Sequence, residues 1–167
     1  MKDPNDRGVE TGRSSAQAPH NVENLIGFLE GTWQFERKVH DMKSDSEQDA
    51  IGVAWFKAGE PHNGQDTLDY SEEGGADLGD TQLELESAFR YNFTNSALAE
   101  VRFTDGRFFH VLDMSKGIVR VDHNCGEDTF SGVFRALGED GWLSVWRIDG
   151  PGKSQVVTTR YIRVQPN

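Results

Sequence analysis

The chain has 167 residues, of which 35% are hydrophobic and 27% charged, and its formal net charge is −11. A chain of this length can bury the core of one domain without a metal or disulfide to stabilise it. The acidic balance argues against a nucleic-acid partner, because phosphates would be repelled. No apolar run approaches the roughly 18 residues of a membrane span, and no signal-peptide core is present. The single cysteine, Cys125, cannot form an intramolecular disulfide, so we expect a cytoplasmic protein.

Residues 1–20 are rich in Asp, Gly, Ser and Arg without periodicity, which predicts a disordered tail before a single domain over residues 21–167. Apolar residues at helical spacing then predict a short helix over residues 21–29. Asn21 is the expected N-cap, and Gly31 ends the helix.

Everything downstream alternates between apolar and polar residues and is interrupted by Gly, Asp, Asn and Pro, which is the pattern of short strands. The expected strands are residues 33–39, 51–55, 67–73, 83–93, 99–103, 108–112, 118–125, 130–134, 142–148 and 155–164. Tight links such as Asp105-Gly106 make consecutive strands antiparallel neighbours, and closure removes exposed edges. We therefore predict an all-β fold, an up-and-down antiparallel barrel of about ten strands with one short N-terminal helix. A β-sandwich is the alternative.

A short helix followed by Gly31-Thr32-Trp33, with Thr159-Arg160-Tyr161-Ile162-Arg163 on the last strand, resembles the calycin barrels, which include lipocalins, fatty-acid-binding proteins and nitrobindins. In that family a basic residue of the last strand often packs across the tryptophan of the first. The resemblance implies the same contact here, which is a cation–π arrangement. Nitrobindins ligate haem through a late histidine, but no histidine follows His123, so no cofactor is expected.

The chain is also similar to a small calycin-type family known only as a domain of unknown function. The similarity spans residues 21–164 and implies a fold without a settled activity. It rests on four motifs: Gly31-Thr32-Trp33, Phe103-Thr104-Asp105-Gly106-Arg107 with His110, His123-Asn124-Cys125 with Asp128, and Gly150-Pro151 with Lys153.

Arg37 shares a face with Trp33, so an inward Trp33 implies an inward Arg37. A buried arginine must be paired, because an isolated charge in a barrel is costly. One interpretation is a clamp for a carboxylate or phosphate ligand. The other is an internal salt bridge, or a side chain that reaches solvent at the barrel mouth.

His110 and His123 lie on consecutive predicted strands and are candidates for acid–base chemistry or ligand contacts. The structural alternative is a histidine bonded to nearby backbone or carboxylates. His123, Cys125 and Asp128 are possible metal ligands, but the chain lacks the separated ligand pairs of zinc sites, so no metal is predicted.

A ten-stranded barrel is wide enough to enclose a cavity. We expect it to bind a small, partly apolar organic ligand with an anionic or polar end. The alternatives are a cofactor-independent isomerase, cyclase or lyase that uses His110 and His123 as catalytic residues, and a protein-interaction module with a filled barrel. The expected ligand-binding residues are Arg37, Trp55, Phe89, Tyr91, Phe103, His110, His123, Trp146 and Tyr161.

Overall fold

The computed structural model describes residues 18–77 and 82–167. The predicted disordered tail lies outside the described residues, except that His20 donates its backbone N–H to the Ala136 carbonyl. One helix and ten strands follow. They are α1 (Leu25–Leu29), β1 (Gly31–Asp41), β2 (Ser46–Ala58), β3 (Thr67–Asp77), β4 (Gln82–Asn95), β5 (Leu98–Phe103), β6 (Phe108–Asp113), β7 (Ile118–Cys125), β8 (Asp128–Ala136), β9 (Gly141–Asp149) and β10 (Ser154–Arg163).

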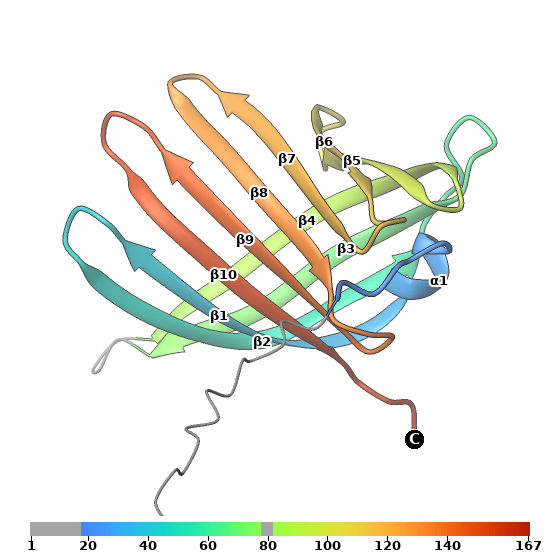
Figure 1. Ribbon diagram of the computed structural model, residues 1–167, viewed down its shortest axis with the longest axis horizontal. Helices are drawn as coiled ribbons and strands as arrows, with labels where there is room; N and C mark the ends of the chain where they lie inside the picture. The colour runs from blue at the N-terminus through green and yellow to red at the C-terminus, as the bar shows by residue number, and fades with distance from the viewer. Residues whose placement is uncertain (1–17, 78–81) are drawn as a thin grey trace, which may run out of the picture.

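All ten strands belong to one antiparallel sheet with the order β6-β5-β4-β3-β2-β1-β10-β9-β8-β7. Every strand pairs with its neighbour in sequence except at β6 and β7, and β1 pairs with β10 to wrap the sheet around. Strands β6 and β7 lie against each other at a seam where the described residues form no ladder. The result is the predicted all-β, nearly closed, up-and-down barrel (Figure 1).

The helix closes one end of the barrel, opposite the hairpins β1–β2, β7–β8 and β9–β10 (Figure 1). Its N-cap is Asn24, whose side chain accepts from the Gly27 N–H at 3.1 Å. The predicted cap, Asn21, is wrong because the chain before Asn24 instead runs along the barrel, where Val22 bonds to the Met114 carbonyl. Among the described residues, no helix is long and apolar enough to cross a membrane.

Trp33 and Arg163 are directly paired across β1 and β10, and the guanidinium lies 4.2 Å from the indole centroid. Arg163 also donates to the carbonyls of Phe28 and Glu30, at 2.6 and 3.1 Å, and forms an ion pair with Asp140. The indole N–H of Trp33 in turn donates to the Leu29 carbonyl at 2.8 Å. The contact that the calycin resemblance implies is therefore present, and it fastens the helix to the first and last strands, β1 and β10.

Strand β2 presents its small residues to the barrel interior. Trp33 pairs with Ala54, and Phe35 pairs with Gly52, so the two bulky rings of β1 lie beside positions with little or no side chain. Trp55 consequently faces outward, where Lys57 lies over its ring. The expectation that Trp55 lines the interior is therefore wrong.

The interior is filled at the helix end and more open at the hairpin end. Leu25, Leu29 and Trp33 are almost completely buried, as are the other side chains packed near α1. Toward the hairpins, inward-facing side chains remain partly exposed. These are Val39, Leu85, Ser87, Phe89, Phe103, His123, Phe130, Trp146, Ile148 and Val157. Because they face the lumen and still meet solvent, the lumen is not filled at this end.

Candidate functional site

A charged pair lies inside the barrel between β1 and β3. The guanidinium of Arg37 donates two parallel hydrogen bonds to Glu72, from Nη1 to Oε1 at 2.7 Å and from Nη2 to Oε2 at 2.9 Å. The Glu72 side chain is 3% exposed and that of Arg37 is 15% exposed. Arg37 also donates from Nε to the Thr159 hydroxyl at 2.8 Å. The geometry is the two-point pairing that guanidinium and carboxylate favour.

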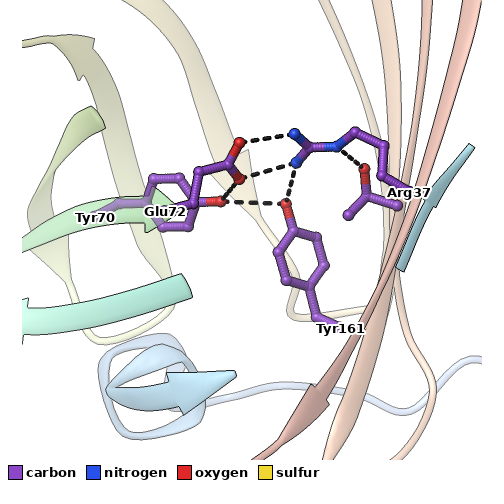
Figure 2. A network of polar contacts seen from close by, with 5 residues as sticks. Arg37, Tyr70, Glu72 and Tyr161 are labelled. Atoms are coloured by element: carbon purple, nitrogen blue, oxygen red, sulfur yellow. Dashed lines mark hydrogen bonds and ion pairs between the residues drawn. The ribbon is translucent and has the colours of Figure 1, made fainter. Parts of the chain in front are cut away.

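Two tyrosines complete this network, as Figure 2 shows. Tyr70 donates its hydroxyl proton to Oε2 of Glu72. The hydroxyls of Tyr70 and Tyr161 are 3.3 Å apart, and Arg37 Nη2 is 3.5 Å from the Tyr161 oxygen. Since Tyr70 has only one proton and gives it to Glu72, Tyr161 must donate to Tyr70. The chain of donors therefore runs from Arg37 through Tyr161 and Tyr70 to Glu72.

Burial sets the protonation states of the phenols. It raises the pKa of Tyr70 well above the usual value, and the neighbouring Tyr161 and Glu72 raise it further. Burial and Glu72 also raise the pKa of Tyr161, although Arg37 partly opposes them. Burial alone would lower the pKa of Arg37, but its hydrogen bond and its attraction to Glu72 keep it above the ordinary value. At neutral pH the guanidinium of Arg37 is therefore charged and the phenols of Tyr70 and Tyr161 are neutral.

An aromatic cluster occupies the lumen on the side of the seam, and Phe109 lies at its centre. The ladder between β5 and β6 shifts at Val101/Arg102, and this bulge directs both Phe109 and His110 inward. The Phe109 ring is nearly parallel to those of Phe89, at 5.5 Å and 13°, and Trp146, at 5.2 Å and 16°. Phe103 lies 4.8 Å from the same ring.

Both candidate histidines contact Phe109, His110 at 4.7 Å and His123 at 5.0 Å between ring centroids. His110 is 3% exposed, and its Nδ1 lies 3.3 Å from the Val111 carbonyl. Burial lowers the pKa of His110 to about 4, the hydrogen bond to Val111 partly offsets this, and His123 lowers the pKa slightly more. His110 is therefore neutral at pH 7, with Nδ1 as its donor and Nε2 as an acceptor.

Eight of the nine predicted ligand-binding residues face the lumen, and Trp55 does not. Tyr91 and Tyr161 are buried near the helix end. Arg37 proves to be held in an internal salt bridge, which was one of the two interpretations of its burial. The remaining five gather around Phe109; they are Phe89, Phe103, His110, His123 and Trp146.

Four residues of the site were not predicted, namely Tyr70, Glu72, Phe109 and Thr159. Glu72 lies on the strand predicted over residues 67–73, but its inward orientation and its pairing with Arg37 were not predicted. The alternation of Leu68, Tyr70 and Glu72 was the available signal, because a carboxylate in an inward position requires a partner such as Arg37. No comparable signal marked Phe109, since a bulge interrupts the alternation.

No metal-binding arrangement of three or more His, Cys, Asp or Glu side chains is found within residues 18–77 and 82–167. Cys125 is exposed at the end of β7, where it pairs across the hairpin with Asp128. His123, two residues earlier, points into the aromatic cluster instead.

Comparison with known proteins identifies the family of this sequence. A model of a family of unknown function, DUF6314, matches residues 29–163. The chain belongs to this family. The DUF6314 match begins in α1 and ends with β10, so it covers the whole barrel. No curated protein matches the sequence.

Among solved structures, this DUF6314 protein is similar to the S-type phycobiliprotein lyase CPES from Guillardia theta, with 10% identity and a TM-score of 0.69. That match covers 89% of this chain and 95% of the lyase. A second similar structure is EF1p2_mFAP2b, solved with DFHBI bound, with 12% identity and a TM-score of 0.46 over 84% of this chain and 98% of that one. The lyase match shows that the two proteins share a calycin-like barrel fold.

Proposed function

We propose that this DUF6314 protein binds a small, partly apolar organic molecule in the hairpin end of its barrel. One observation carries the proposal: Phe89, Phe103 and Trp146 face the lumen and are still partly exposed. Large aromatic side chains bury well in a core, so partly exposed aromatics in an interior indicate room for another apolar group. Mostly apolar walls with a few polar groups are the general anatomy of ligand pockets.

A polar group inside the barrel supplies the second requirement, which is a way to orient the ligand. A neutral His110 offers Nε2 as an acceptor. His110 is buried, and a buried polar group is stabilised by a hydrogen bond. The ligand's polar end is therefore expected to meet His110 rather than the satisfied Arg37–Glu72 pair.

The lyase similarity supports only the scaffold. The name of that lyase associates it with phycobiliproteins, and at 10% identity nothing about the substrate transfers to this chain.

Native mass spectrometry of protein purified from its own source tests the proposal. We expect a mass in excess of the polypeptide that is lost on denaturation. Two variants on β4 test whether the bound molecule lies in the lumen. Ser87→Trp places a large ring in the lumen, and Ala88→Trp places the same ring on the exposed outer face. The proposal requires that Ser87→Trp lose the excess mass and that Ala88→Trp keep it. Retention by both variants, or absence of any ligand from the unaltered protein, would refute it.

A further inference from the structure

We infer that the ligand is a neutral, planar aromatic molecule that takes the slot between Phe89 and Trp146 now filled by Phe109. The inference rests on the proposed function and names its ligand class. Phe89 on β4 and Trp146 on β9 each stack on Phe109. Phe109 is thus the middle ring of three nearly parallel rings that span the lumen.

The slot selects for planarity. Interplanar angles of 13° and 16° on the two sides of Phe109 define two parallel walls, and offset stacking is a favoured arrangement for aromatic rings. Phe103 and His123 border the same ring at 4.8 and 5.0 Å. A flat aromatic molecule can reproduce each of these contacts, whereas a saturated ring has no π-face to stack on the two walls.

The charges of the lumen select for neutrality. Arg37 and Glu72 cancel each other at 2.7 and 2.9 Å, so neither is free to attract an ion. His110 is buried and neutral at pH 7. An anion in the slot would have to give up its hydration without gaining a cation, which is costly. This differs from the anionic end expected from the sequence, because that expectation required an unpaired Arg37.

Phe109 is placed where it can leave the slot. It belongs to β6, which is the edge strand at the seam and is bonded only to β5 in the described ladder. The bulge at Val101/Arg102 already interrupts that ladder beside Phe109. A change of the Phe109 side-chain conformation at this interrupted edge would release the ring and leave His110, the next residue, in the lumen. Phe109 therefore acts as an internal competitor of the ligand, which lowers the apparent affinity by the fraction of time that it fills the slot.

Calorimetric titration with three related probes tests both the ligand class and the competition by Phe109. The probes are 2-naphthol, which is neutral and planar; decahydro-2-naphthol, which is neutral and not planar; and 2-naphthoate, which is planar and anionic. Two variants are compared with the unaltered protein. Phe109→Ala empties the slot, and Phe108→Ala removes the neighbouring ring, which is 46% exposed on the outside.

We expect 2-naphthol to bind the unaltered protein at least about fivefold more tightly than either other probe, as one or two ring stackings would give. Phe109→Ala should tighten 2-naphthol binding by about fivefold or more, and Phe108→Ala should leave it unchanged. If Phe109→Ala does not fold, as judged by circular dichroism, Phe109→Leu replaces it, with the same direction expected.

Equal affinities in the Phe109 and Phe108 variants, or a preference for decahydro-2-naphthol or 2-naphthoate, would overturn the inference. In either case binding to the lumen would still stand, provided that Ser87→Trp abolishes it. Failure of the proposed function looks different: no probe would bind any variant, and Ser87→Trp would change nothing.

Discussion

Arg37 and Glu72 face each other across the interior side of β2, joined by two hydrogen bonds of 2.7 and 2.9 Å. Beside the pair, the strand between them presents the small residues Ala50 and Gly52 to that side, so no side chain of β2 separates the guanidinium from the carboxylate. The pair is matched in charge and almost closed to solvent. It therefore serves as an internal brace and leaves the aromatic cluster beyond it uncharged.

Breaking this pair from one side should be strongly destabilising. Glu72→Gln leaves the buried Arg37 charge without its anion, and we expect a loss of about 3 kcal/mol or more in the free energy of unfolding. Replacing both residues, as Arg37→Met with Glu72→Leu, should cost less than Glu72→Gln alone. Urea denaturation measures each variant. Glu73→Gln on the exposed face is the control, and an equal effect of Glu72→Gln and Glu73→Gln would contradict the brace.

Stability should fall as the pH drops through the range in which His110 is protonated in the unfolded chain. Burial depresses the folded pKa from 6.5 to about 4, so the unfolded state binds the proton more tightly. Stability is full above pH 6.5, declines between 6.5 and 4, and levels off below that, for a total of about 3 kcal/mol.

The measurement for this prediction is the free energy of unfolding between pH 4 and 7. His110→Gln should remove the slope in this window, whereas the exposed His62→Gln should retain it. An unchanged slope in His110→Gln would show that other groups set the pH dependence.

Replacement of Arg163 by lysine should lower the stability of the fold. It stacks on Trp33 at 4.2 Å and donates to the carbonyls of Phe28 and Glu30, and lysine has no planar fork to make all these contacts at once. We expect Arg163→Lys to cost about 1–2 kcal/mol. Arg160→Lys, three residues earlier and exposed, should cost less than about 0.5 kcal/mol. Thermal unfolding of the two variants measures these costs, and equal shifts in Tm would contradict the prediction.

Gly52 should tolerate no side chain. A Cβ there would lie 2.3 Å from the Glu73 carbonyl oxygen and 2.4 Å from the Phe35 ring. Gly52→Ala should therefore destabilise the barrel by about 1–3 kcal/mol. A Cβ at Gly152, in the β9–β10 loop, would meet no atom within 4 Å, so Gly152→Ala is the matched control. Similar chemical denaturation midpoints for both variants would argue against the close approach.

Local alternation was enough to predict the ten strands and their antiparallel order, because these features depend on neighbours in sequence. The contact of a basic residue with Trp33 was implied by the calycin resemblance, and the structure shows that this residue is Arg163. The inward face of β2 was not predictable in the same way. Both of its faces carry apolar residues, and the choice is made by β1, whose Trp33 and Phe35 need the small partners Ala54 and Gly52. That information lies in the pairing register.

The same limit applies to the site. Arg37 was predicted to point inward, but its partner Glu72 is 35 residues away on a strand reached only through β2. Phe109 escaped prediction because a bulge puts two consecutive residues on one side of β6, and period-2 alternation cannot represent that. Interior polar partners and bulges are thus set by tertiary pairing, which a single sequence does not display.

A crystal structure of the protein with the molecule that it retains from its own source would test the central claim most directly. The account predicts electron density for a flat molecule in the lumen, between Phe89 and Trp146, with the Phe109 ring moved out of its place and the Arg37–Glu72 pair intact. A molecule bound on the outer face of the barrel, or a retained molecule that replaces Glu72 as the partner of Arg37, would contradict it.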